Sequence, residues 1–226
     1  MIVTYAATRR LYPHLIPAMR SLLTFNKVDE IIVLAEDVIV PDLPKVCRII
    51  NVSEQQVFPQ DSPNMKSIFT WMALMRVTIA ELVPDIDKIL QLDVDTIVVD
   101  DLTPLWETDL TNKYFAAVPE YKGNYNPFDN PMYFNTGVCL LNLSKMRADN
   151  VTEQMVNLLN RRRMYCADQD GFNLIARDMS REIPLRYNEC FCCGETDNPA
   201  IVHFAGVADW FENPKMHRRE FLDRFR

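Results

Sequence analysis

The sequence predicts an α/β protein whose core is a parallel β-sheet covered by helices. Strand-like apolar segments at residues 1–6 and 30–34 flank an amphipathic segment at residues 12–25, and this close spacing is typical of a parallel sheet. Residues 89–94 include Ile89, Leu90, Leu92 and Val94, which is typical of a strand that is buried on both faces. A hydrophobic content of 48% with only 5 glycines in 226 residues favours a single packed domain, residues 1–226, over a disordered chain.

The rest of the chain alternates further strands and helices. A helix is predicted over residues 65–83, where apolar residues recur at helical spacing. Arg76 is the cation of this helix, and by itself it indicates only a solvated face. Residues 120–133 are rich in Gly, Asn, Pro and aromatic residues, which predicts a loop over the functional site. The other expected elements are strands at 46–52, 114–118, 134–143 and 201–204, a helical turn at 102–106, a helix at 144–163, a helix opening at Asp168 and a charged tail at 215–226.

Asp93 and Asp95 follow the apolar strand directly and are the first candidates for chemistry. Side chains two residues apart in a strand point the same way, so both carboxylates would face one spot. An ionised carboxylate at the end of a buried strand needs a partner. Oxygen ligands of this kind suit a hard divalent cation, Mg²⁺ or Mn²⁺. A strand that simply ends in a solvated loop remains the alternative.

Two other uses of an Asp-x-Asp pattern fit this sequence poorly. An EF-hand loop beginning at Asp93 would need a glycine at its sixth position and a glutamate at its twelfth, where Val98 and Pro104 stand. A phosphatase with an aspartyl nucleophile usually carries the pattern near its N-terminus, with Thr or Val four residues after the first Asp. Here the pattern lies in mid-chain and Ile97 occupies that position. A phosphate-ester hydrolase is therefore disfavoured.

Composition argues against several classes of partner. The chain has 31 acidic and 24 basic residues and a net charge of −7, which disfavours binding to duplex nucleic acid. No apolar run reaches the roughly 18 residues of a membrane span, and the N-terminus does not resemble a signal peptide, so we expect a cytoplasmic location. The six cysteines show no spacing typical of a disulfide framework. Cys190, Cys192 and Cys193 could hold zinc only with a fourth ligand from elsewhere.

Four separated motifs call for one explanation, although each is weak alone. They are Asp93-x-Asp95, Phe134-Asn135-Thr136-Gly137, Asp168-Gln169-Asp170 and His203-Phe204-Ala205-Gly206. Together and in this order, they closely resemble the motifs of glycosyltransferase family 8, which contains glycogenin and the bacterial lipooligosaccharide galactosyltransferases. The resemblance runs from the first strand to about Trp210 and so covers nearly the whole chain.

The resemblance implies a GT-A fold, a Rossmann-like nucleotide-sugar-binding domain with a mixed central sheet. It implies a retaining hexosyltransferase that uses Mn²⁺, with Mg²⁺ as the alternative, and UDP-glucose or UDP-galactose as donor. The acceptor would be a carbohydrate, a lipid-linked sugar or another molecule, held against residues 120–133 and 187–195. By motif position, Asp93, Asp95 and His203 resemble the family's protein ligands to the metal. An imidazole beside two carboxylates suits Mn²⁺ better than Mg²⁺.

The resemblance also implies contacts with the donor. Asp168 and Gln169 match the pair beside the anomeric carbon. Because an amide is a poor nucleophile, we favour displacement on the front face of the sugar, with Asp168 and Gln169 as the positioning groups. Arg76 stands where similar bacterial members place an arginine that contacts the donor. The other donor contacts expected from the resemblance are Ala6, Ala7, Thr8, Val94, Asn135, Thr136 and Gly206, with Thr8 standing where many relatives have Asp.

One departure from the family bears on function. Relatives commonly continue the last motif as His-x-x-Gly-x-x-Lys-Pro-Trp, in which the Lys binds the diphosphate. Here the run is one residue shorter, and Asp209 stands where the cation is expected. Lys215 could substitute from further along the chain. The alternative function is therefore a degenerate module that binds a nucleotide-sugar without turning it over.

The C-terminal tail, residues 211–226, mixes basic and aromatic residues. Such a segment could rest on an anionic membrane surface that bears a lipid-linked acceptor. It could equally pack Phe221, Leu222 and Phe225 on the core as a surface helix.

Overall fold

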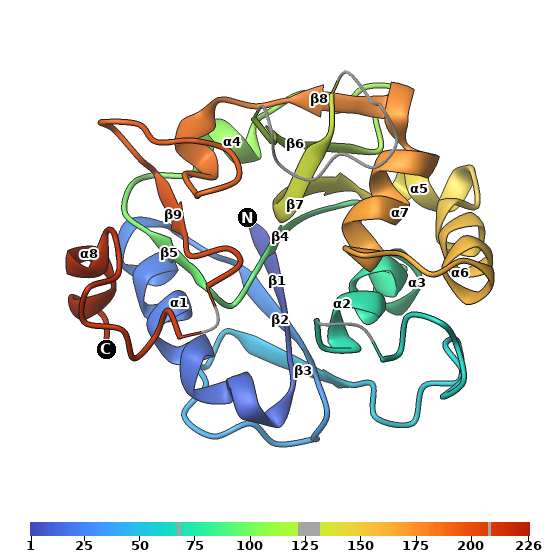
Figure 1. Cartoon of the computed structure of the whole chain (residues 1–226), viewed down its shortest axis with the longest axis horizontal. Coiled ribbons are helices and arrows are strands. Elements are labelled where there is room, and N and C mark those ends of the chain that lie inside the picture. Colours follow the sequence, from blue (N-terminus) through green and yellow to red (C-terminus); the bar gives the residue numbers. More distant parts are fainter. Residues whose placement is uncertain (67–68, 122–131, 208) are drawn as a thin grey trace.

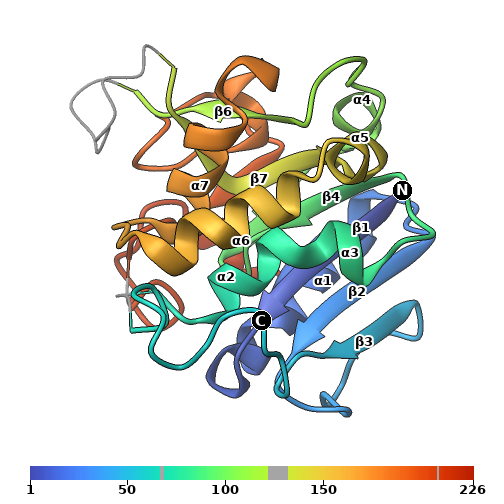
Figure 2. The same ribbon diagram turned by 90° about the vertical axis from the view of Figure 1, so that its right-hand side faces the viewer.

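The computed structural model describes every residue except 67–68, 122–131 and 208, and shows helices on both faces of a central sheet (Figures 1 and 2). The sheet has seven strands in the order β3-β2-β1-β4-β7-β6-β8, and only β7 runs against the others. The mixed sheet implied by the family resemblance is therefore confirmed, and the parallel arrangement predicted from the residues holds for β1 to β4. The strands are β1 (Ile2–Ala7), β2 (Glu30–Ala35), β3 (Cys47–Asn51), β4 (Lys88–Leu92), β6 (Phe115–Pro119), β7 (Phe134–Asn142) and β8 (Ser180–Glu182).

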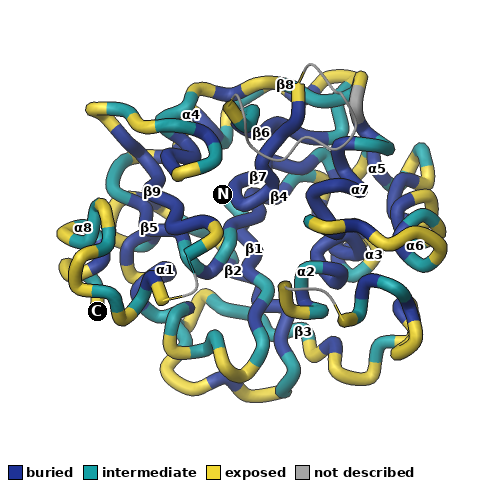
Figure 3. Tube along the Cα trace, viewed as in Figure 1, coloured by how far each residue is buried: buried dark blue, intermediate teal, exposed yellow. Residues whose placement is uncertain are grey.

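Each face of the sheet is covered by its own group of helices. The helix α1 (Tyr12–Phe25) matches its predicted bounds and packs Leu15, Met19 and Leu22 against one face. The opposite face is covered by α2 (Met72–Met75), α3 (Ile79–Leu82), α5 (Leu143–Ala148), α6 (Val151–Arg161) and α7 (Ala167–Ile175). Burial is concentrated along the central strands and on the inner sides of these helices (Figure 3). The sheet therefore provides a rigid edge on which a site can be built.

A second, two-stranded sheet carries the last motif to the site. β5 (Thr96–Val98) pairs in antiparallel fashion with β9 (Ile201–His203), and Thr96 lies opposite His203 in the register. The Val98 N–H donates to the hydroxyl of Ser21 on α1, at 3.0 Å, which attaches β5 to the body of the protein. The pairing brings residues from mid-chain and from near the C-terminus side by side.

Two predicted helices are broken in the structure. Among its described residues, the segment predicted at 65–83 is helical from Met72 onward and contains a 3-10 turn, η2 (Arg76–Thr78), between α2 and α3. The segment predicted at 144–163 is divided between α5 and α6 because Asn150 adopts a left-handed backbone conformation with φ of 53°. The remaining short elements are η1 (Arg9–Leu11), α4 (Thr103–Trp106), η3 (Arg177–Met179), η4 (Leu185–Tyr187) and α8 (Arg219–Asp223).

The C-terminal tail packs on the protein through its apolar residues. Leu222 on α8 is fully buried beside Phe204 and Trp210, and Phe221 and Phe225 pack against the same cluster. Several of the tail's arginines are engaged within the protein: Arg218 pairs with Glu189, Arg219 with Asp223 and Arg226 with Glu212. The packing alternative is thus confirmed, and contact of the tail with a membrane stays a prediction. Within the described part of the chain, no helix is both long enough and apolar enough to cross a bilayer.

Candidate active site

Asp93 and Asp95 lie in a turn at the carboxyl end of β4. The strand stops at Leu92, and the turn is closed by Thr96, whose N–H and hydroxyl donate to the Asp93 carbonyl at 3.2 and 2.7 Å. The prediction that a continuing strand aims the two carboxylates was therefore wrong. The turn directs both toward the same point, at the edge where β1 and β4 also end. This is the edge where open α/β sheets bind ligands.

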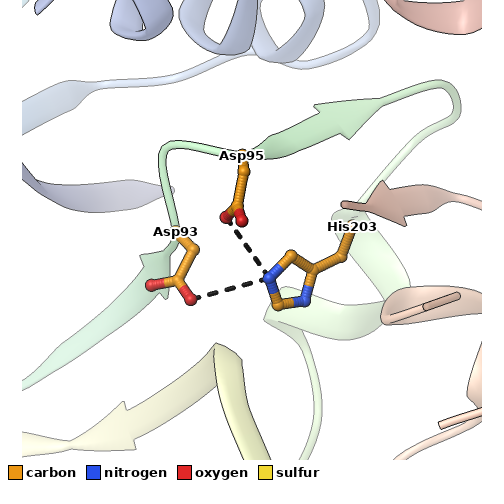
Figure 4. A group of neighbouring side chains, drawn as sticks. All are labelled: Asp93, Asp95 and His203. Atoms are coloured by element: carbon orange, nitrogen blue, oxygen red, sulfur yellow. Dashed lines mark ion pairs between the residues drawn. The ribbon is translucent and has the colours of Figure 1, made fainter. Parts of the chain in front are cut away.

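His203 completes a group that could hold a metal ion. Its Nε2 lies 3.3 Å from Oδ1 of Asp95 and 3.6 Å from Oδ2 of Asp93 (Figure 4). Among the described residues, these three side chains are the only such group, with their ligand atoms all within 4.8 Å of one another. Burial by itself would lower the pKa of His203, but the Asp95 carboxylate raises it well above its usual value. One imidazole nitrogen and carboxylate oxygens suit a borderline-hard divalent ion.

Gly137 on β7 lies directly against this group. A Cβ added at Gly137 would lie 2.1 Å from Cε1 of His203 and 2.9 Å from Oδ2 of Asp93. The backbone of β7 also supports the turn, because the Asp93 N–H donates to the Gly137 carbonyl at 2.8 Å. The glycine of the Phe134-Asn135-Thr136-Gly137 motif is therefore required by the close approach of β7 to His203.

The Gly137→Ala variant is expected to bind Mn²⁺ at least about 10-fold more weakly, because the new methyl group must push His203 away from Asp93. The measurement is titration of Mn²⁺ in the presence of UDP. Gly171→Ala is the matched control, since its one tight contact would be with the flexible end of Met155, at 3.1 Å, beside ordinary contacts with Leu159 at 3.7 and 3.8 Å, and Ala favours a helix. Equal Mn²⁺ affinity in the two variants would contradict this prediction.

Arg76 is buried beneath the carboxylates, so its interpretation as a solvated cation was wrong. Its Nη1 lies 2.6 Å from Oδ1 of Asp93 and 3.1 Å from Oδ2 of Asp168. Nη2 donates to the Thr136 carbonyl. The Gln91 amide, with its oxygen turned toward Arg76, accepts from Nε at 3.1 Å and from Nη2 at 2.9 Å. One guanidinium thus connects the Asp-x-Asp turn to Asp168.

Asp168 and Gln169 enter the site from the first turn of α7, close to the predicted start of that helix. Burial raises the pKa of Asp168 to about 6, against the opposing effect of Arg76. Oδ2 of Asp168 accepts no hydrogen bond from the described residues. Gln169 is held at both ends: its Oε1 accepts from the Thr136 N–H at 3.0 Å, and its Nε2 donates to Glu120 at 2.9 Å.

Two residues of the site, Glu120 and Asn188, lie in the segments predicted to hold the acceptor but were not singled out from the sequence. Glu120 follows β6 and accepts hydrogen bonds from Gln169 and from Asn135, each at 2.9 Å. Asn188 is fully buried, and its Oδ1 lies 2.8 Å from Nδ1 of His203. Glu120 could have been predicted as a site residue, because it is a polar residue at the carboxyl end of a buried strand. Asn188 follows the short turn η4 and has no comparable signal.

The other predicted residues lie at the same edge or beside it. Ala6 and Ala7 end β1 and Thr8 follows it, and Val94 is buried in the turn between the two aspartates. Gly206 follows β9 with a φ of 74°, in the left-handed region that favours glycine. Asp209 and Lys215 are both exposed, and their roles toward a diphosphate stay predictions.

The predicted loop at 120–133 lies mostly outside the described residues. Cys190, Cys192 and Cys193 form no disulfide, and none belongs to a group that could hold a metal ion within the described chain.

Comparison with protein families gives a match over most of the chain. The model of "Glycosyl transferase family 8" matches residues 41–212. General stress protein A of Bacillus subtilis is 29% identical over 184 residues, which cover 68% of this chain and 64% of that protein. A putative glycosyltransferase of Haemophilus influenzae is 29% identical over 140 residues, or 57% of this chain and 42% of that protein. The chain thus spans less than two thirds of the length of these curated relatives.

Solved structures share the fold at low sequence identity. The galactosyltransferase LgtC, solved with donor and acceptor sugar analogues, aligns with a TM-score of 0.78 and 22% identity over 100% of this chain and 95% of that one. The glycosyltransferase GlyE of Streptococcus pneumoniae aligns with a TM-score of 0.75 and 22% identity over 99% of this chain and 59% of that one. These similarities confirm the GT-A fold that the sequence motifs implied.

Proposed function

The chain belongs to glycosyl transferase family 8, and from this membership we propose that it is a metal-dependent, retaining hexosyltransferase using UDP-glucose or UDP-galactose. The observation that carries the proposal is the contact of Arg76 with both Asp93 and Asp168. Through this contact, a candidate metal group and the Asp168–Gln169 pair form one continuous site. A hydrolase or a simple metal site would not need Asp168 and Gln169 beside the metal group.

The candidate metal group fits Mn²⁺. Asp93 and Asp95 offer carboxylate oxygens and His203 offers a nitrogen, and the missing side chain of Gly137 leaves room beside them. The side chains of the two aspartates remain 29% and 22% exposed, so the group is open to a ligand. When bound, the ion would supply Lewis-acid stabilisation to a departing diphosphate.

A cavity next to the end of β1 supports a nucleotide donor. It measures about 650 Å³ and is lined by Arg9, Glu36, Phe58 and Trp71, among others. Arg9 directly follows Thr8, where the resemblance implies contact with uracil and ribose. Glu36 is held in place by the Trp71 indole N–H at 2.9 Å and by the Arg9 backbone N–H at 2.8 Å. We propose that the nucleoside lies at the mouth of this cavity, with its diphosphate toward Asp93.

The sugar would lie over Arg76, Asp168 and Gln169. Oδ2 of Asp168 pairs with Nη1 of Arg76 at 3.1 Å but accepts no aligned hydrogen bond from the described residues, so this buried oxygen still has a lone pair that a sugar hydroxyl could satisfy. Gln169, held by Thr136 and Glu120, cannot turn away from the sugar without breaking two hydrogen bonds. In the proposed front-face reaction, the bond from C1 to the diphosphate oxygen breaks and a bond to the acceptor oxygen forms on the same face. The acceptor's hydroxyl proton passes to the departing diphosphate.

The acceptor is proposed to approach beside Glu120. Tyr121 and Phe191 are 64% and 81% exposed, and the Tyr121 N–H donates to the Cys192 carbonyl at 2.9 Å. This bond holds the two aromatic residues on neighbouring segments. Exposed rings at the side of a polar site suit the apolar face of a saccharide. We therefore propose a saccharide acceptor, free or lipid-linked.

The proposal is tested by measuring the release of UDP from UDP-glucose, UDP-galactose and other UDP-sugars without added acceptor, in Mn²⁺ and then in EDTA. We expect one donor to be hydrolysed slowly, and this hydrolysis to require Mn²⁺. The donor that reacts would identify the sugar. Binding of UDP with Mn²⁺ but no turnover, even when a panel of saccharide acceptors is added, would favour the binding module. Absence of UDP binding would overturn the donor assignment.

A further inference from the structure

We propose that Asn188 is a positioning residue that determines which nitrogen of His203 faces the metal group and that links this ligand to Gln169 at the sugar end of the site. The inference deepens the proposed function and rests on it. It is carried by a chain of hydrogen bonds that runs between residues from five separate segments of the sequence.

The chain of hydrogen bonds begins at the metal group and ends at the sugar site. Nδ1 of His203 lies 2.8 Å from Oδ1 of Asn188, whose Nδ2 donates to Oδ1 of Asn135 at 2.9 Å. Nδ2 of Asn135 donates to Oε1 of Glu120 at 2.9 Å, and Nε2 of Gln169 donates to that same oxygen at 2.9 Å. His203, Asn188, Asn135 and Gln169 are all at least nine-tenths buried, so the two bonds made by Asn188 are shielded from solvent, while the two bonds to Glu120 are partly buried.

The direction of each amide follows from a backbone donor. The Gly137 N–H donates to Oδ1 of Asn135 at 3.0 Å, and a backbone N–H can only donate. Oδ1 of Asn135 must therefore face that position, and the group that Asn188 presents to it must be its NH₂. The oxygen of Asn188 is then left for Nδ1 of His203, which must carry a proton to donate to it.

The other end of the chain is oriented in the same way. The Thr136 N–H donates to Oε1 of Gln169 at 3.0 Å, so the NH₂ of Gln169 faces Glu120. The carboxylate of Glu120 accepts from both Gln169 and Asn135. Two backbone N–H groups on adjacent residues of β7 thus set the orientation of every amide in the chain.

This arrangement reserves Nε2 of His203 for the metal. With the proton held on Nδ1 by Asn188, the lone pair of Nε2 is directed at the space between Asp93 and Asp95. Without Asn188, the imidazole could carry its proton on Nε2 or rotate about its side-chain bonds. Loss of an outer partner of this kind typically weakens metal binding about 10- to 100-fold.

The test uses the full chain and measures Mn²⁺ binding directly, from the spectroscopic signal of free Mn²⁺ in the presence of UDP. The Asn188→Ala variant is expected to bind Mn²⁺ about 10- to 100-fold more weakly than the wild type. Asn64→Ala is the matched control, because Asn64 is also fully buried and bonds to Leu159, Arg162 and Met164 away from the site. This control is expected to lower thermal stability and to leave Mn²⁺ affinity unchanged.

A second variant separates the two roles of Asn188. Asp at this position keeps an oxygen for Nδ1 of His203 but cannot donate to Asn135, and its charge repels Oδ1 of Asn135. The Asn188→Asp variant should therefore keep Mn²⁺ affinity near the wild-type value while it slows Mn²⁺-dependent hydrolysis of the UDP-sugar. If Asn188 had a purely structural role, Asn188→Asp would reduce stability and would not affect hydrolysis and Mn²⁺ affinity differently.

The outcomes distinguish the inference from the proposed function. If the wild type does not bind Mn²⁺ with UDP, the proposed function fails first. If the wild type binds and Asn188→Ala binds equally well, the assignment of Asn188 is overturned. Should the alanine variant fail to fold, Asn188→Asp decides: unchanged hydrolysis, or a parallel loss of hydrolysis and Mn²⁺ affinity, contradicts the inference.

Discussion

The Asp95→Asn variant is expected to lose Mn²⁺-dependent release of UDP from its donor by a factor of about 10² to 10³. Asp95 supplies a charged oxygen to the candidate metal group, and its Oδ1 lies 3.3 Å from Nε2 of His203. An amide oxygen in that place carries no charge, so the variant holds the divalent ion less tightly and neutralises the diphosphate less well. The measurement is the initial rate of UDP release at several Mn²⁺ concentrations.

Two controls accompany this experiment. Asp85→Asn removes an exposed carboxylate from the turn before β4, and it is expected to release UDP at the wild-type rate. Thermal unfolding of Asp95→Asn shows whether the variant is folded under the assay conditions. A folded variant that retains full Mn²⁺-dependent activity would mean that Asp95 does not contribute to the metal group.

The Arg76→Met variant is expected to lose about 3 to 5 kcal/mol of unfolding free energy, since removing one partner of a buried ion pair leaves the other charge without compensation. Here two carboxylates would be affected, Asp93 at 2.6 Å and Asp168 at 3.1 Å from the same nitrogen. The Thr136 carbonyl and Gln91 would also lose donors. Urea denaturation of the variant and the wild type, in EDTA, measures the difference.

Arg9→Met is the matched control for this stability measurement. Arg9 makes a bidentate contact with Asp37, but its side chain is 70% exposed, and an exposed ion pair contributes little to stability. A loss below about 1 kcal/mol for Arg76→Met, similar to that of the control, would show that the guanidinium is not needed to hold the two carboxylates.

Much of the framework could be predicted from local patterns. The structure confirms the helix at 12–25 and the strands around 2–7, 30–35 and 134–142. Each of these segments carries an uninterrupted periodicity or an apolar run. The predictions failed where one residue changed the backbone locally. Asn150, in the left-handed region, divides a helix that the apolar pattern would continue. The 3-10 turn at 76–78 likewise interrupts an apolar stripe that still faces the core.

Sequence by itself determined most of the residues that could form the site, though not the roles of Glu120 and Asn188, because four motifs with chemically matching side chains imply one family and its fold. Only the tertiary structure decided how those side chains act on one another. The two aspartates converge through a turn, Arg76 is buried between carboxylates from distant segments, and Asn188 meets His203 beside an isolated β-bridge between Glu189 and Val202. Such contacts depend on distances and hydrogen-bond directions between segments far apart in the chain. The local sequence pattern around a residue does not predict those distances and directions.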